Sequence, residues 1–380
     1  MQLYGDGKRD DTKQIQAMLD EGGIVKIDKN GDYLISKTLI IHSNTRFVLA
    51  PGARLVLADN ARCALIQNEY FLGGGRDKNI EIIGGIFDGN CDNQGFDCYD
   101  LIEHRNDHPY SPDRYSGKLL RFAHVDSILL DKLTVRNPNG YGIQIGDTVG
   151  FAVKNIYFDY NWHYGCTYGA HINGPAKDGV IENLYGTTND DMVSLTPVDE
   201  QHAEVTFGEI KNVDIRNITA KNGYSGVRLL SCGNCAIKHI KVSGVYGDYR
   251  HNAVLLGHHY ARPDDTRNLF DNIVIEDVYA KKSTTPLTED CFRLWEKDAI
   301  ETLPVIWFFN DINITNLTVK NVYRSEDVKT DTSLIKIEKE VNIDRFVLDN
   351  VAQRLPDGSN SKLLEFDGTI NTLLKSNVTE

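Results

Sequence analysis

Two adjacent aspartates, Asp190 and Asp191, are the residues whose type and spacing most directly suggest chemistry. They lie between a predicted turn, residues 186–189, and a predicted short strand, residues 192–195. Hydrolysis of a glycosidic bond needs one protonated and one ionised carboxyl group, and two close carboxyl groups separate their pKa values in that direction. The pair predicts acid/base hydrolysis if the chain bends at residues 189–191, because neighbouring side chains of a regular strand point apart.

Short apolar segments broken by Gly, Asn, Asp and Pro follow one another from Gly23 onward. Many share one template: apolar, any residue, apolar, two polar residues that often include Asn or Asp, then apolar again. The repeat is about 22 to 39 residues long, the range of solenoid coils, when the equivalent points are Leu133, Ile156, Leu184, Ile218, Ile240, Val278, Leu317 and Val351.

An Asn at each bend can stack on an Asn of the neighbouring coil and satisfy backbone groups there. A β-sandwich also contains many short strands, but it would not repeat one Asn–apolar motif in every coil. We therefore predict an all-β chain folded as a right-handed parallel β-helix.

The chain of 380 residues has no low-complexity tract or linker, so we expect residues 1–380 to form a single domain. Residues 1–22 are predicted to cap one end of the solenoid, with a short helix over residues 14–19 whose first turn Asp11 or Thr12 would cap. Residues 90–117 have weak periodicity and predict a long inserted loop. Its aromatic side chains would either stack on sugar rings or pack against the solenoid.

The formal net charge of −13 opposes binding to nucleic acids or anionic membranes, so we expect a carbohydrate partner and neither of those. The N-terminus resembles no signal peptide, and no apolar run is long enough to cross a bilayer. We therefore expect a chain that works inside a cell, belongs to a phage particle or has lost its signal.

The cysteines, seven in number, are scattered and do not predict a disulfide framework. Cys232 and Cys235 form a CxxC motif, but no second CxxC or His pair stands at zinc-binding spacing. The sequence therefore predicts no metal site and no cofactor.

Successive coils can be aligned through the apolar pairs that would face the core. These pairs are Ile143/Ile145, Ala170/Ile172, Val193/Leu195, Val227/Leu229, Val254/Leu256 and Phe292/Leu294. The residues between them form an outward column of Gln144, His171, Ser194, Arg228, Leu255 and Arg293. The same register places Tyr168 beside Asp191 and Thr167 opposite Asp190. We predict that Gln144, Tyr168, His171, Arg228 and Arg293 contact a substrate that the aspartates cleave.

Several motifs resemble those of the polygalacturonase family of glycoside hydrolases (family 28) and its pectin-degrading β-helix relatives. They are Gly5-Asp6-Gly7 with Asp10-Asp11-Thr12, residues 85–90, residues 133–138, residues 167–172 and Asn189-Asp190-Asp191. By this resemblance Asp190 would be the general acid, and Asp191 would be the base that orients water in an inverting hydrolysis.

Some positions differ from the family pattern. Tyr168 stands where the family has an acid, and Ser225 stands where it has a histidine. Residues 255–257, Leu-Leu-Gly, stand where the family has the Arg and Lys that bind a uronate carboxylate. The resemblance therefore leaves the substrate open, and Arg228 and His258 are the candidates to replace the lost cations.

Two other functions remain open from the sequence. In a polysaccharide lyase or epimerase, Tyr168, His171 or Arg228 would remove the C5 proton of a uronate. In a non-catalytic glycan-binding solenoid, such as a phage tail spike, the acids would only bind sugar hydroxyls, and a trimer would be expected.

Overall fold

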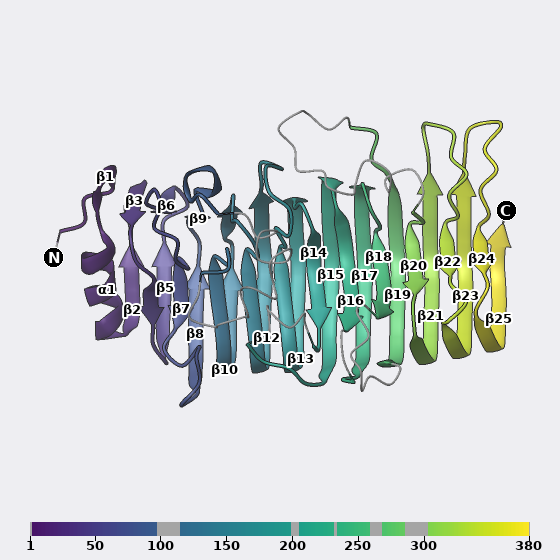
Figure 1. Ribbon diagram of the computed structural model, residues 1–380, viewed down its shortest axis with the longest axis horizontal. Helices are drawn as coiled ribbons and strands as arrows, with labels where there is room; N and C mark the ends of the chain where they lie inside the picture. Colours follow the sequence, from purple (N-terminus) through teal and green to yellow (C-terminus); the bar gives the residue numbers. More distant parts are fainter. Residues whose placement is uncertain are drawn as a thin grey trace.

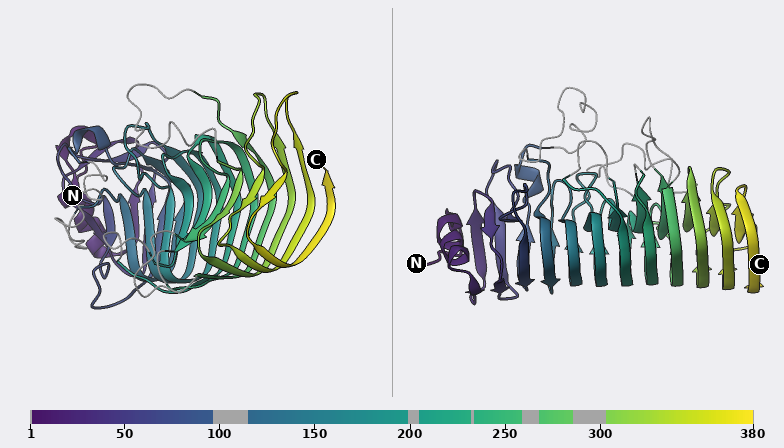
Figure 2. Two further views of the ribbon diagram at one scale, coloured as in Figure 1. Left: turned by 45° about the vertical axis from the view of Figure 1, so that its right-hand side comes forward. Right: turned by 90° about the horizontal axis from the view of Figure 1, so that it is seen from below.

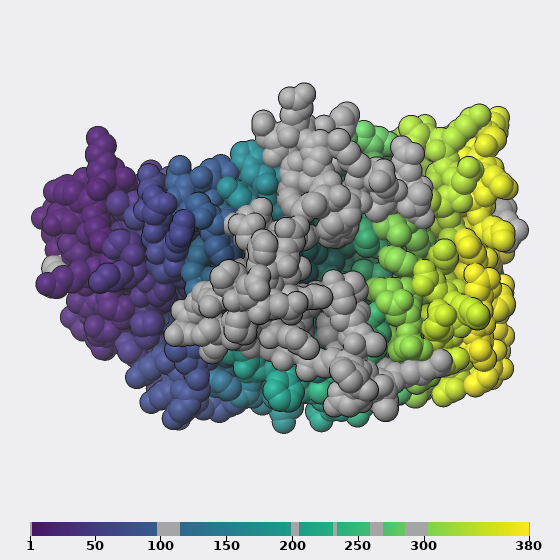
Figure 3. Space-filling view, in the orientation of Figure 1, coloured from purple at the N-terminus to yellow at the C-terminus, as the bar shows by residue number. Residues whose placement is uncertain are grey.

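The computed structural model of the protein describes residues 2–96, 115–198, 205–231, 234–258, 268–285 and 303–379. The chain winds into a right-handed parallel β-helix whose coils stack in chain order from the N-terminus to the C-terminus (Figure 1). The 25 described strands belong to one hydrogen-bonded sheet, and strands of successive coils pair in parallel. The predicted fold class is confirmed, and the stack forms the elongated body seen in Figure 3.

The described secondary structure consists of one α-helix, one short 3-10 helix and the strands. The bounds are β1 Asp6–Asp10, α1 Thr12–Glu21, β2 Gly23–Ile27, β3 Gly31–Ile35, β4 Leu39–Ile41, β5 Thr45–Leu49, β6 Ala53–Leu57, β7 Ile66–Asn68, β8 Asp77–Ile83, β9 Ile86–Asp88, η1 Cys91–Asn93, β10 Leu120–Asp131, β11 Thr134–Arg136, β12 Ile143–Asp159, β13 Ala170–Thr187, β14 Asp191–Thr196, β15 Ile210–Gly223, β16 Ser225–Ser231, β17 Ile237–Tyr249, β18 Val254–His258, β19 Asn268–Lys282, β20 Ile306–Phe309, β21 Ile312–Ser325, β22 Ile335–Ile337, β23 Asn342–Arg354, β24 Leu364–Phe366 and β25 Thr369–Thr379.

The helix α1 lies at the N-terminal end of the stack, as predicted (Figure 1). It buries Ile15 and Leu19, which covers the apolar end of the first coils. The predicted cap is wrong in its detail. Asp11 occupies the N-cap position without a side-chain hydrogen bond to the helix, and its carboxylate instead accepts hydrogen bonds from the backbone N–H groups of Tyr4 and Gly5, at 2.7 and 3.0 Å. The Asp11 carboxylate fixes the entering chain, and the N–H of Thr12, the first residue of the helix, is accepted by Asp10 instead, at 2.9 Å.

Asparagines at the bends form the predicted stacks. Asn155, Asn183 and Asn217 all adopt positive φ, between 55° and 58°. The Asn183 side-chain amide donates to Asn155 at 2.9 Å, and the Asn217 amide donates to Asn183 at 3.0 Å. Asn tolerates this left-handed conformation better than most residues. We call these three residues the asparagine ladder.

The predicted equivalence of coils slips at two points. Ile218 pairs with Val245 rather than with Ile240, and Val278 pairs with Val322 rather than with Leu317. The cause is a second positive-φ bend in the same coil, as at Asn212 and Asn217 or at Asn272 and Asp277. Both bends carry the same Asn-and-apolar signature, so the template fits either of them.

The core runs through the centre of the solenoid and is made of inward-facing Ile, Val, Leu and Phe side chains from every coil. Burial of one such side chain stabilises the fold by about 1.5–3 kcal/mol before the entropy cost of ordering the chain. The long strands bend at the Asn corners and serve more than one face. Residues 170–173 of β13 pair with β14, while residues 176–186 pair with β15. In Figure 2 these faces form parallel rows of strands.

Candidate active site

The predicted outward column is present, in the predicted register, as far as Leu255. In successive coils Gln144 pairs with His171, His171 with Ser194, Ser194 with Arg228, and Arg228 with Leu255. The register follows from the inward apolar neighbours of these residues, because a shift by one residue would turn them to the outside. The column brings a histidine, a hydroxyl and a guanidinium onto adjacent strands.

The next position of the column is Trp307, which corrects the prediction. Leu255 pairs with Trp307, and Val254 and Leu256 pair with Ile306 and Phe308. Arg293 lies outside the described residues. A second apolar–x–apolar triplet, Phe292 to Leu294, therefore misled the alignment.

A second row of residues lies three positions earlier in the same coils and carries Asp191. The Gly142 N–H donates to the Tyr168 carbonyl at 2.8 Å, and the Gly169 N–H donates to the Asp191 carbonyl at 2.9 Å. Asp191 in turn pairs with Ser225. The predicted neighbours Tyr168 and Asp191 thus lie side by side, whereas Thr167 forms its bridge with Asn189 instead of Asp190.

The chain bends at Asp190, which lies just before the start of β14. The Thr188 hydroxyl donates to the Asp190 carbonyl at 2.7 Å, and the Asp191 N–H donates to the Asp190 carboxylate at 3.0 Å. Asp190 and Asp191 are 5% and 1% exposed. The bend therefore places two buried carboxyl groups at consecutive positions of the chain, and close carboxyl groups separate their pKa values.

Arg228 is the counter-charge of this pair. Its Nε lies 2.6 Å from Asp191 Oδ2, although the N–H does not point along that line. Its Nη2 donates to the Tyr168 hydroxyl at 2.9 Å, and its Nε also reaches Ser194 Oγ at 3.4 Å. One guanidinium therefore contacts the acid, the phenol and the hydroxyl together.

Burial raises the pKa of Asp191, because desolvation outweighs the lowering effects of Arg228, His171, Ser225 and Asp190. Burial also raises the pKa of Tyr168 well above its usual value, against the lowering effect of Arg228. Burial acts to lower the pKa of Arg228, but the nearby Asp191, Tyr168 and Asp190 outweigh this effect and raise the pKa well above its usual value. The guanidinium stays charged, and the Tyr168 phenol stays protonated at neutral pH.

His171 is held by aromatic rings. The Tyr141 ring stacks on it with centroids 4.2 Å apart at 10°, and the Tyr168 ring meets it edge-on at 4.9 Å. His171 is fully buried. Tyr141 was missed by the sequence analysis, although the register that places Tyr168 beside Asp191 also places Tyr141 beside Tyr168.

Two other predicted contacts lie further from the acids. Gln144 is 1% exposed, and its amide donates to Asn173 at 2.8 Å, so it supports the strand that carries His171. His258 ends β18, six residues beyond Asn252, which follows Ser225 in the row of Asp191. At about 3.3 Å per residue, that offset is about 20 Å along the strand. The structure does not bring His258 to the carboxyl pair.

Ser225 and His251 border the site on its other side and were also missed. Ser225 Oγ lies 3.4 Å from His251 Nδ1, and Tyr224 stacks on the His251 ring at 4.6 Å. Burial, with Lys282 and Arg228 nearby, lowers the pKa of His251 well below its usual value, so the imidazole is neutral. The register that aligns Val227 with Val254 also places His251 beside Tyr224, so this alignment could have found His251.

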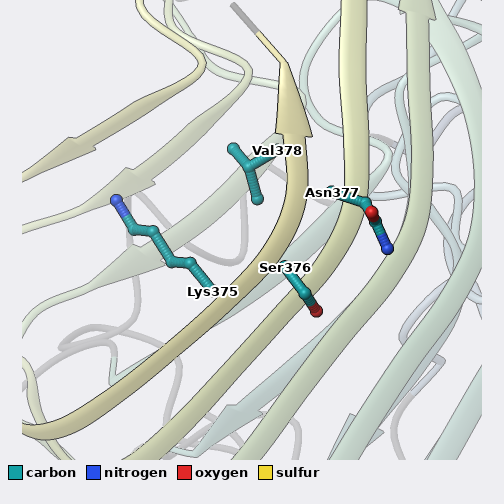
Figure 4. Close-up of a pocket in the computed structure, with 4 residues that line it drawn as sticks. All are labelled: Lys375, Ser376, Asn377 and Val378. Carbon is teal, nitrogen blue, oxygen red and sulfur yellow. The ribbon is translucent and has the colours of Figure 1, made fainter.

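In the part of the chain that the structure describes, no three His, Cys, Asp or Glu side chains gather into a possible metal site. No described helix is long and apolar enough to span a membrane. A surface hollow beside β25 is lined by Lys375, Ser376, Asn377 and Val378 (Figure 4). It lies in the last coil, away from β14.

No family model matches the sequence, and no curated protein matches it either. Solved structures match in fold along the chain. The A-module of a mannuronan C-5 epimerase of Azotobacter vinelandii has 13% identity and a TM-score of 0.63, covering 98% of this chain and 97% of that one. A hyperthermoactive exopolygalacturonase of Thermotoga maritima has 13% identity and a TM-score of 0.60, covering 98% and 90%.

A family 28 exopolygalacturonase of Yersinia enterocolitica has 15% identity and a TM-score of 0.58, covering 100% of this chain and 77% of that one. At these identities the likeness concerns the fold. The chain therefore has the right-handed parallel β-helix fold that family 28 polygalacturonases also have.

Proposed function

We propose that the protein is a glycoside hydrolase that cleaves a poly- or oligosaccharide with Asp190 and Asp191. The observation that carries this proposal is the burial of two consecutive carboxyl groups, with the Arg228 guanidinium 2.6 Å from Asp191. Carboxyl groups are costly to bury, so an adjacent pair at one bend of an otherwise repetitive solenoid needs a reason. Acid/base hydrolysis gives that reason.

The contacts support different roles for the two acids. Arg228 lies against Asp191 and favours its ionised form, so we assign the proton to Asp190. Asp190 then donates this proton to the leaving glycosidic oxygen. Asp191 accepts a proton from the attacking water, and its raised pKa makes its carboxylate a stronger base than an exposed one. Water attacks the anomeric carbon directly, which inverts its configuration.

The fold comparisons support a glycan as the substrate. The similar structures include exopolygalacturonases and a mannuronan C-5 epimerase. Their identity to this chain is at most 15%, so they support the class of substrate and not the sugar.

A second candidate is removal of the C5 proton of a uronate by Tyr168, as in a lyase or epimerase. The contact of Arg228 Nη2 with the Tyr168 hydroxyl, 2.9 Å, favours it because a cation stabilises a phenolate. Burial works against it, since the pKa of Tyr168 is raised well above its usual value. An unsaturated product that absorbs in the near ultraviolet would identify a lyase, and an epimerase would change the uronate composition without cleavage.

The hydrolase proposal is tested by release of new reducing ends from a panel of purified glycans. We expect wild-type protein to release them from at least one glycan, and Asp190→Asn to lower kcat by about 100- to 10,000-fold, the range of general acid catalysis. Asp214→Asn is the matched control, because Asp214 is exposed on β15. Near-normal turnover by Asp190→Asn would contradict the proposal.

A further inference from the structure

Beyond Arg228 the outward face of the solenoid changes from polar to apolar. Leu230, Leu255 and Phe309 are 3%, 4% and 8% exposed and form a cluster of their own, outside the central core, with Trp307 packed against them. Their strands are neighbours, since β16 pairs with β18 and β18 pairs with β20. The column that begins with Gln144, His171 and Arg228 thus continues as an apolar surface on the following coils.

The cluster is built as two rows. Arg228, Leu255 and Trp307 follow one another in the first row, and Leu230, Gly257 and Phe309 in the second. A Cβ atom on Gly257 would lie 2.0 Å from the Phe309 ring, so only glycine leaves room for that ring across the strand. The space that a side chain at Gly257 would fill is thus occupied by an aromatic ring from the next coil.

Trp307 is fixed in place at the accessible edge of this cluster. Its indole stacks on Phe309 with centroids 4.6 Å apart at 25°, and its Nε1 donates to Glu338 at 3.1 Å. Trp307 is half-buried, whereas its three apolar neighbours are buried. A ring that is already held costs little entropy when a ligand stacks on it.

The charge around the indole decides which sugar suits it. The other cluster residues Leu230, Leu255 and Phe309 carry no charge, and Lys336, which follows Trp307 in the first row, lies 3.9 Å from Glu365. Arg228, which precedes Leu255, already contacts Asp191. Glu338, which accepts the hydrogen bond of the indole, is itself a carboxylate. Among the described residues, a uronate carboxylate over the indole would therefore lose its hydration without gaining a dedicated partner, whereas the C–H face of a neutral sugar loses little.

We propose that Trp307 is a stacking platform for a neutral sugar residue of the substrate. This inference rests on the proposed hydrolase function, because it places the sugar next to the cleaved bond. Two strand spacings, about 10 Å, separate Trp307 from Arg228. The substrate is therefore a glycan with a neutral residue on the side of the acid pair that leads toward the C-terminal coils.

Calorimetric binding tests this proposal in an Asp190→Asn background, which prevents turnover. The probes are neutral xylo-, manno- and galacto-oligosaccharides, and an oligogalacturonate of the same length as a charged probe. We expect Trp307→Ala to weaken binding of a neutral probe at least about tenfold, the effect of losing a stacked tryptophan, and that of oligogalacturonate less. Trp307→Phe keeps a ring and is expected to retain most of the affinity.

Tyr185→Ala is the matched control, because Tyr185 is an exposed ring that stacks on Tyr157 on another face of the solenoid. Unchanged binding of the neutral probes by Trp307→Ala, equal weakening of neutral and charged probes, or no binding of any neutral probe would overturn the inference. Failure of the wild-type protein to release reducing ends would instead overturn the hydrolase proposal. The binding measurement would still show independently whether Trp307 binds a neutral sugar.

Discussion

The asparagine ladder and the Asp190–Asp191 site both place polar side chains on successive coils, but in different ways. Asn155, Asn183 and Asn217 recur at equivalent bends, are half-buried or exposed, and each amide pairs with the next. Asp190 and Asp191 occur once, are buried, and depend on Arg228 for charge balance. The repeating asparagines serve the coil, whereas two consecutive buried aspartates beside a guanidinium favour a role in chemistry.

The largest expected effect is on turnover. Asp191→Asn removes the base and should lower kcat by about 100- to 10,000-fold, while Asn217→Ala should leave kcat within about twofold of wild type, because the ladder bends lie outside the two rows of the site. Steady-state kinetics on the best glycan of the panel provides the measurement. Equal losses of kcat in the two variants would contradict a specific role of Asp191 in turnover.

The next effect is on stability, at the ion pair. Arg228→Met leaves the Asp191 carboxylate buried without its partner and should lower the free energy of unfolding by about 3 kcal/mol. Arg216→Met is the matched control, because Arg216 pairs with Glu182 at 3.7 Å with side chains 42% and 26% exposed. The control should change stability by less than about 1 kcal/mol. Denaturant unfolding measures the free energy of unfolding of both variants. Equal losses would mean that the buried ion pair contributes no more to stability than the exposed one.

The pH dependence of stability tests the charge state of Asp191. Its pKa is raised above the usual 3.8 in the folded protein, so between 3.8 and the folded value the folded state binds the proton and the unfolded state does not. This contribution to stability is complete below 3.8 and is lost as the pH rises through the folded value. Wild type should therefore lose stability relative to Asp191→Asn as the pH rises. A gain over that range would show a lowered pKa instead.

The smallest effect is expected in the ladder. Asn217→Ala loses one amide link and places a Cβ-bearing residue with no side-chain hydrogen bond at a φ of 57°, which should cost about 1–2 kcal/mol. Asn217→Gly relaxes the backbone but gives the unfolded chain more entropy, so the difference between the two variants measures the strain in alanine less that entropy. If Asn217→Gly were the less stable variant, backbone strain at this position would be smaller than we expect.

The fold and much of the site could be predicted because apolar alternation fixes which side chains face out. Gln144, His171, Ser194 and Arg228 follow from it. The register past Leu255 could not be predicted, because a long connection can hold any number of residues at little free-energy cost. A second apolar triplet within it, at residues 292–294, then matched the template as well as the true strand β20 did.

Local chemistry explains the other differences. Asp11 stands where a helix cap belongs, but the N–H groups of Tyr4 and Gly5 compete for the same carboxylate. His251 reaches Ser225 from the next coil, where its N–H donates to the Tyr224 carbonyl, and its position between two strands hid it from an alignment of strands alone. Trp307, on which the substrate inference rests, was missed because the triplet at residues 292–294 took the place of its strand in the alignment.

The most direct test of the central claim follows the oxygen of water. In water labelled with oxygen-18, hydrolysis by the Asp190–Asp191 pair should place one labelled atom at each new reducing end, as read by mass spectrometry soon after mixing. Unlabelled product kept in the same water for the same time corrects for spontaneous exchange. We predict label in the wild-type products and none above this control with Asp190→Asn. Cleavage that yields unlabelled, unsaturated ends would contradict hydrolysis and favour proton abstraction by Tyr168.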